Sequence, residues 1–236
     1  MIERLWGAVG RYRLVYRSMN RLKIAMASDV VSPFCWMACL QVEQAIAQFP
    51  EVEFELSLLP FQVTPDLPLD YTFEQYQREH MTRTFGSMDG VRNILSQITS
   101  MGRECGCEFH MELVTAWPNS RRAHGLWAMA ANEKQRWQIH KALCQAHFQH
   151  GENLNEISTL SYIGERFGLD PVRAAEQLSD DSYIRDVLRD VSRTRALGIH
   201  SVPTLILNDR HRIQGATGRQ ELAATIRNIL SDGESA

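Results

Sequence analysis

The chain has 236 residues, of which 44% are hydrophobic and 22% charged, and both fractions are typical of globular rather than disordered proteins. Lys and Arg number 25 and Asp and Glu 28, giving a formal net charge of −3, which offers no extended basic surface for nucleic acid. The longest charge-free segments, 30–42 and 196–208, have 13 residues each, whereas a membrane-spanning helix needs about 20 apolar residues. We therefore expect a soluble protein with no nucleic-acid partner and no spanning membrane segment.

The cysteine count and the N-terminus indicate the compartment. Five cysteines are an odd number in a chain too long to depend on disulfides, which favours a cytoplasmic protein with reduced thiols. The first 23 residues carry six Lys or Arg against one Glu, and their apolar segment Leu5–Val9 is too short for a signal peptide. We interpret residues 1–20 as a basic N-terminal extension. Two alternatives remain open: this segment contacts a membrane surface peripherally, or translation starts at Met19.

The first predicted elements are a strand, a helix and a second strand. Residues 22–28 read LKIAMAS, a short apolar strand, and a turn follows. Ser32 is a suitable N-cap whose hydroxyl can accept a backbone N–H, and Pro33 suits the first helical position. In this helix Cys35 and Cys39 fall on the apolar face. Residues 52–59 alternate at period two, which predicts a parallel strand and an opening βαβ unit.

Helical periods dominate from 72 to 198, with breaks at glycine and proline positions. Residues 204–207 then predict a strand, and residues 212–214 predict the second strand of a hairpin. Residues Thr217 to Gln220 predict a capping box at the start of the last helix. The predicted fold class is α/β, thioredoxin-like with a large α-helical insertion. Its parts after the extension are a thioredoxin-fold N-terminal part (21–71), a helical insertion or lid (72–198) and a thioredoxin-fold C-terminal part (199–236).

Two motifs carry a resemblance to a known family. Ser32-Pro33-Phe34-Cys35 stands where thioredoxin-like proteins have C-x-x-C, and Ser201-Val202-Pro203-Thr204 stands where they have a cis-proline loop. Over residues 22–230 the chain resembles the DsbA-like family, closest to its FrnE branch, with kinship to 2-hydroxychromene-2-carboxylate isomerase and kappa-class glutathione transferase. Further matching segments, in family order, are Ser28–Val31, Pro65–Pro68, Pro118–His124, Gly198–Pro203 and Ile213–Ala216.

The first hypothesis is that the chain is a DsbA/FrnE-family thiol-disulfide oxidoreductase. In redox members of the family the first cysteine is the nucleophile, and here Ser32 replaces it. A dithiol cycle through this motif is impossible, so Cys35 would act alone as the reactive sulfur, in a glutathionylation-type reaction. The competing interpretation is that Cys35 is a core residue. We rank this hypothesis first because the whole chain resembles that branch.

The second hypothesis is a glutathione-dependent transferase or isomerase. In those branches the equivalent serine donates a hydrogen bond to the thiolate of glutathione, and the helix N-terminus lowers the pKa of that thiol. The resemblance implies Ser32 in this role, unless Ser32 is only a helix cap. Further residues that would bind glutathione or substrate are Pro33, Phe34, Val202, Pro203, Ala216 and Thr217. A third hypothesis is a non-catalytic relative that binds extended peptide at the Val202-Pro203 loop.

Other candidate residues have simpler interpretations. Asn119 and His124 match the family as lid contacts; Asn119 or Ser120 suits a helix N-cap, and His124 suits a polar group buried between lid and core. Cys105 and Cys107 suit core packing better than a second redox pair. A metal set of Cys144 with His140, His147 and His150 lacks a carboxylate ligand, so we expect no metal.

The expected cofactor is therefore glutathione, and the expected partners are glutathione or a thiol-bearing or extended-peptide substrate, with a homodimer left open. Two structural features separate the hypotheses. Complete burial of Cys35 without a cationic neighbour would remove it as a nucleophile. An apolar cavity beside Ser32 would favour a small-molecule substrate, and an open groove would favour a protein substrate.

Overall fold

A computed structural model describes residues 20–233, so the predicted basic extension lies outside the described residues, apart from Asn20. In this part of the chain the strands form one mixed sheet in the order β2-β1-β3-β4. Their bounds are β1 Asn20–Ser28, β2 Val52–Pro60, β3 Thr204–Leu207 and β4 His211–Gln214. β1 runs parallel to β2 and antiparallel to β3, and β3 pairs antiparallel with β4.

The burial of the strands follows their side-chain pattern. In β1, Leu22 and Ile24 are buried while Arg21 and Lys23 are exposed, as expected for a strand with one face toward a core. β3 lies between β1 and β4 and is buried at all four positions, so both of its faces are covered. The sequence therefore reads as alternating in β1 and as a continuous apolar run in β3.

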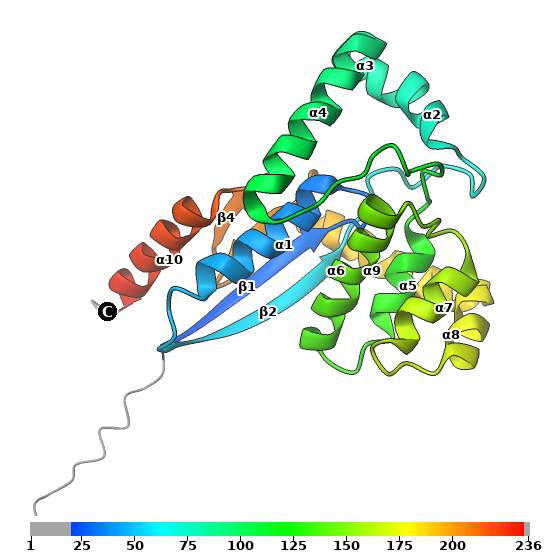
Figure 1. Cartoon of the computed structure of the whole chain (residues 1–236). Helices are drawn as coiled ribbons and strands as arrows, with labels where there is room; N and C mark the ends of the chain where they lie inside the picture. The colour runs from blue at the N-terminus through cyan, green and yellow to red at the C-terminus, as the bar shows by residue number, and fades with distance from the viewer. Residues whose placement is uncertain (1–19, 234–236) are drawn as a thin grey trace, which may run out of the picture.

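The helices that complete the fold are arranged around this sheet. α1 (Pro33–Ile46) packs against α10 (Arg219–Gly233), and both α6 (Glu133–His150) and α9 (Asp181–Ala196) contact β2. α5 (Arg121–Ala128), α7 (Ile157–Glu165) and α8 (Pro171–Ser179) cluster beside α6 and α9, as Figure 1 shows. The predicted thioredoxin-like fold with a large helical insertion is confirmed. No helix in residues 20–233 combines the length and the apolar character that crossing a membrane requires.

One part of the insertion stands apart as a helical arm (73–105). It consists of α2 (Phe73–Tyr76), the π-helical turn η1 (Gln77–Met81), α3 (Thr82–Phe85) and α4 (Met88–Cys105). In Figure 1 the arm rises above α1 and the sheet, and its residues line one cleft with Ser32, Pro33 and Phe34 at the start of α1. The arm therefore stands over the segment that carries the S-x-x-C motif.

The two predicted caps need correction in detail. Pro33 is the first residue of α1 and Ser32 occupies the N-cap position in an extended conformation, but the Ser32 hydroxyl makes no cap hydrogen bond. That hydroxyl interacts with the Cys35 thiol instead. α10 begins at Arg219, one residue later than the capping box at Thr217 predicts.

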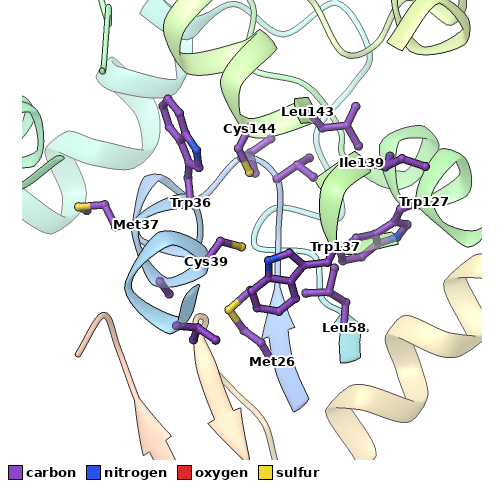
Figure 2. Packing of buried hydrophobic residues seen from close by; sticks show 14 of the residues in the cluster. Met26, Trp36, Met37, Cys39, Leu58, Trp127, Trp137, Ile139, Leu143 and Cys144 are labelled. Carbon is purple, nitrogen blue, oxygen red and sulfur yellow. The ribbon is translucent and has the colours of Figure 1, made fainter. Parts of the chain in front are cut away.

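The main core lies between α1 and the sheet and continues under α6. Figure 2 shows Cys39 of α1, Met26 of β1 and Leu58 of β2 on the side of α1 that faces the α6 side chains, which include Trp137 and Cys144. Met37 points to the other side of α1 and belongs to the same core cluster. Cys39 and Cys144 are fully buried. Cys105 and Cys107 belong to the same core cluster, as the core-packing interpretation predicts, so four of the five cysteines are core residues.

Candidate active site

The site begins with the first turn of α1. The Ser32 carbonyl accepts hydrogen bonds from the N–H groups of Cys35 and Trp36. In the described part of the chain nothing accepts the N–H of Phe34. Ser32 is 7% exposed. The positive end of a 14-residue helix thus presents a hydroxyl and a backbone amide, which favours a negatively charged group there.

A cleft of about 880 Å³ opens in front of this turn, within the size range of small-molecule sites. Ser32, Pro33 and Phe34 line it at the start of α1. Its apolar wall comes from the helical arm and from segments after it: Phe73, Tyr76, Met81, Phe85, Ile94, Leu95, Ile98, Met111, Trp117 and Phe148. The Trp117 ring stacks on the rings of Tyr76 and Phe73 at centroid distances of 4.0 and 5.2 Å. Five of these ten side chains are aromatic, so the wall is half aromatic and half aliphatic.

The proline loop lies in the same cleft. The Val202–Pro203 peptide bond is cis, Pro203 is buried, and Val202 lines the cleft together with Ser32. The Pro203 carbonyl accepts a hydrogen bond from Gly215 N–H at 2.8 Å. Ala216 and Thr217, which the sequence placed in the same site, do not line the cleft.

The charged groups at the cleft are cationic. Arg83 and Arg195 line it, with His80 and His200, and no carboxylate of residues 20–233 does. The Arg195 guanidinium donates to the Gln62 carbonyl at 2.6 Å and lies 4.3 Å from the centre of the Phe61 ring. Sequence reasoning missed both arginines, because nothing in the sequence separates them from the other exposed arginines of the insertion.

The geometry does not support Cys35 as a reactive sulfur. Its side chain is fully buried and does not line the cleft. Burial raises the pKa of the Cys35 thiol to about 11, although hydrogen bonds from the hydroxyls of Ser28 and Ser32 act in the opposite direction. The Asp29 carboxylate raises this pKa further. Cys35 therefore remains a protonated thiol beneath the first turn of α1.

A buried polar network lies under the same turn; His124 is a predicted lid contact, whereas Asp29 is absent from the predicted site. Asp29 is fully buried; its Oδ2 accepts the Val63 N–H at 2.7 Å, and its Oδ1 lies 3.5 Å from His124 Nε2. The same His124 nitrogen bonds the Phe61 carbonyl at 2.8 Å. His124 therefore joins α5 to the loop after β2, as the lid-to-core interpretation predicts, and does not line the cleft.

A second buried pair connects β1 with α6. Ser28 Oγ and His140 Nε2 are 2.9 Å apart, and the Cys144 sulfur is 3.8 Å from the same nitrogen. Burial lowers the pKa of His140 to about 3, so the imidazole is neutral at physiological pH. His147 lies near Trp117 instead. Among residues 20–233 no group of three or more His, Cys, Asp or Glu is arranged to hold a metal ion.

Asn119 organises the loop beside the cleft. Its side-chain NH₂ donates to the carbonyls of Pro65 and Leu67 at 3.0 and 2.8 Å. Its Oδ1 accepts from Gln62 at 3.0 Å and from the Arg121 N–H at 3.3 Å. Ser120 holds the N-cap position of α5 without a side-chain cap bond. Asn119 therefore caps α5 and ties the loop to it, as a structural lid contact.

Comparison with known proteins gives one family and several related structures. The family model described as DSBA-like thioredoxin domain matches residues 23–227. The YwbO protein of Bacillus subtilis (strain 168) is 26% identical over 198 residues, which cover 83% of this chain and 91% of that protein.

Solved structures share the fold at low sequence identity. A probable DsbA oxidoreductase from Streptomyces coelicolor superposes with a TM-score of 0.78 at 18% identity, covering 88% of this chain and 89% of that one. A 2-hydroxychromene-2-carboxylate isomerase superposes with a TM-score of 0.64 at 15% identity, covering 91% of this chain and 99% of that one. The cytosolic disulfide reductase DsbM from Pseudomonas aeruginosa, solved with GSH, superposes with a TM-score of 0.58 at 15% identity, covering 89% of this chain and 99% of that one. These likenesses establish the fold, which serves both redox and isomerase chemistry.

Proposed function

Because the chain belongs to the DsbA-like thioredoxin domain family, which includes oxidoreductases and isomerases, we propose that it is a glutathione-dependent transferase or isomerase. Ser32 would hold the thiolate of glutathione, and the aromatic part of the cleft would hold an apolar electrophile. One observation carries the proposal. The cleft at the start of α1 is lined by Ser32 and by none of the five cysteines. Sulfur chemistry there requires a thiol from outside the chain.

The residues at the start of α1 suit a bound thiolate. The Ser32 hydroxyl is not used as a helix cap. Because Cys35 stays protonated, its S–H can donate to the Ser32 oxygen in their contact, which leaves the Ser32 proton to donate to a sulfur in the cleft. The positive end of α1 and the Phe34 N–H add favourable electrostatics, which lower the pKa of a thiol bound there. When bound, glutathione would supply the sulfur nucleophile that the chain itself lacks.

Two further features suit the peptide part of glutathione. Within residues 20–233 the Val202 backbone makes no hydrogen bond, which leaves it available for strand-like pairing with an extended ligand. Arg195 is held in place by Gln62 and Phe61, and Arg83 faces the same cleft from the helical arm. Guanidinium groups at a cleft without lining carboxylates favour the carboxylates of glutathione.

The remaining apolar wall suits the second substrate. Phe73, Tyr76 and Trp117 give stacked aromatic surface, and aliphatic side chains of α4 complete it. A planar or aromatic electrophile would bury its apolar surface against this wall. A protein-disulfide role is less well supported, because Cys35 is buried under Ser32.

Calorimetry with reduced glutathione tests the proposal directly. We expect the wild type to bind, Ser32→Ala to bind more weakly, and the bound thiol to ionise at lower pH in the wild type, followed by thiolate absorbance. Ser161→Ala is the matched control, because Ser161 is another buried serine that does not line the cleft. A chromogenic aryl halide then tests catalysis.

The negative outcomes are distinct. If neither the wild type nor Ser32→Ala binds glutathione, the proposal fails, and an extended peptide or a protein thiol becomes the ligand to test. If both bind equally and the thiol pKa is the same in both complexes, the cleft binds glutathione but Ser32 has no role in activating it.

A further inference from the structure

A second sulfur site lies at the C-terminal end of the helical arm, where α4 meets α1 (Figure 1). α4 ends at Cys105, Gly106 forms its left-handed C-cap with φ +92°, and Cys107 follows. The Sγ atoms of Cys105 and Cys107 are 3.9 Å apart, and both cysteines are reduced. A disulfide bond is about 2.05 Å long, so the sulfurs need to approach by roughly 2 Å. Side-chain rotation can supply a movement of this size.

The backbone holds the two residues in a defined turn. The Cys107 N–H donates to the Gly102 carbonyl at 2.8 Å, and the Gly106 N–H donates to the Arg103 carbonyl at 3.4 Å. Gln44 of α1 donates to the Cys105 carbonyl at 2.9 Å. With one residue between them, the two Cα atoms are at most about 7 Å apart, close to the range that disulfides span. The turn therefore brings the thiols together before any oxidation.

The two sulfurs differ chemically in the way a nucleophile and a resolving thiol differ. The Cys105 and Cys107 sulfurs are in hydrogen-bond contact at 3.9 Å, and this contact lowers the pKa of Cys105 to about 7, although the Cys105 sulfur also lies 3.3 Å from the Gly102 carbonyl. The same contact, with burial, raises the pKa of Cys107 far above its ordinary value. Of the two thiols, Cys105 therefore ionises the more readily, and Cys107 keeps its proton.

Access is also unequal. Cys105 is 5% exposed and Cys107 is fully buried. A surface pocket of about 340 Å³ reaches Gly106, whose missing side chain leaves the turn uncovered, and Lys141 and Glu108 line the same pocket. Cys35, Cys39 and Cys144 have no exposed surface. Among the five cysteines, a reagent from solvent would reach Cys105 first.

We propose that Cys105 and Cys107 form a redox-active pair that a low-molecular-weight disulfide, such as oxidised glutathione, converts into an intramolecular disulfide. The Cys105 thiolate attacks one sulfur of the small disulfide and displaces the other as a thiolate, which forms a mixed disulfide. Cys107 then gives up its proton and attacks the Cys105 sulfur, which displaces the second small thiolate. The protein loses two electrons and two protons, and the small disulfide becomes two thiols. This site is independent of the cleft at Ser32.

Thiol mapping at equilibrium tests the pair. The full chain is equilibrated with mixtures of oxidised and reduced glutathione, quenched with acid, unfolded, alkylated and analysed by peptide mass spectrometry. As the oxidised fraction rises, we expect residues 105 and 107 to lose both alkylation sites together, and Cys35, Cys39 and Cys144 to keep theirs. The peptide mass should fall by two hydrogens relative to the reduced, unalkylated form.

Variants separate the two sulfurs. Cys107→Ala should trap one glutathionyl group on Cys105, and Cys105→Ala should show neither the adduct nor the disulfide. Cys39→Ala is the control, because it removes a buried cysteine and should leave the disulfide intact. Circular dichroism checks that each variant folds, and the wild-type map decides the question if a variant does not.

Three outcomes would overturn the proposal. The first is that both thiols of the wild type stay alkylatable at a ratio that fully oxidises a reference C-x-x-C protein. The second is a disulfide in Cys105→Ala, which would assign the chemistry to another pair. The third is a linkage of Cys105 or Cys107 to Cys39 or Cys144.

Discussion

The start of α1 and the end of α4 divide between them what a thiol oxidoreductase normally has in one place. The start of α1 has a large cleft and the positive end of a helix, but its lining residue is Ser32 and Cys35 lies buried beneath it. The end of α4 has two thiols 3.9 Å apart at the negative end of a helix, which disfavours a thiolate. The contact with the Cys107 thiol offsets that effect at Cys105. Sulfur reactivity in this molecule therefore depends on hydrogen-bond donors and access more than on position in the family motif.

The largest expected effect is a gain of function at the first site. Ser32→Cys would place a thiol at the positive end of α1 with Cys35 one turn inside, and the helix end would lower the pKa of the new thiol. We expect insulin-disulfide reduction, measured by turbidity with glutathione as reductant, to rise from background to a clear rate. Ser32→Ala is the control and should stay at background. An inactive Ser32→Cys protein whose new thiol has an ordinary pKa would show that the helix end does not activate sulfur here.

The next effect compares native cysteines at the two sites. The pKa of Cys35 is raised to about 11 by burial, and that of Cys105 is lowered to about 7 by the Cys107 thiol. At pH 8 the thiolate fractions then differ roughly 1000-fold. Iodoacetamide labelling of the folded protein, followed by peptide mass spectrometry, should modify Cys105 far faster than Cys35, with a rate that rises through pH 7. Faster labelling of Cys35 would reverse the comparison.

Sequence patterns predicted the frame around both sites. Alternation in β1, Pro33 at the first helical position and the strand pair after Gly198 are local signals, and local signals suffice for regular elements. The contacts that define the sites are not local. Ser28 meets His140 across 112 positions of sequence, and the cleft wall combines α4 with the short helices α2 and α3 and with later segments, an arrangement that no local pattern predicts. The C-x-C spacing fits either packing or redox chemistry, and the left-handed Gly106 decides how close the sulfurs lie.

Acid should lower the free energy of unfolding, because the fold keeps His147 of α6 neutral. Burial lowers the pKa of His147 from 6.5 to about 4, so between these values the unfolded chain binds a proton that the folded protein does not. This contribution to stability is complete above pH 6.5 and is lost as the pH falls, by about 1.4 kcal/mol per pH unit. His147→Gln should flatten the pH dependence of the free energy of unfolding in urea. His150→Gln, at an exposed site on the same helix, should leave the slope unchanged.

The smallest effect tests whether the turn at the end of α4 positions its thiols. Gly106→Ala puts a side chain at φ +92°, where the new Cβ meets only Leu40 at 3.9 Å, so the cost is backbone strain of about 1 kcal/mol. Gly168→Ala is matched to it, with φ +83° and nothing within 4 Å. Both should lower the free energy of unfolding by similar amounts, measured in urea. Because only Gly106 lies between two thiols, only Gly106→Ala should shift the glutathione ratio at which the Cys105–Cys107 disulfide is half formed. An unchanged ratio in Gly106→Ala would mean that side-chain rotation alone, rather than the glycine turn, brings the two sulfurs together.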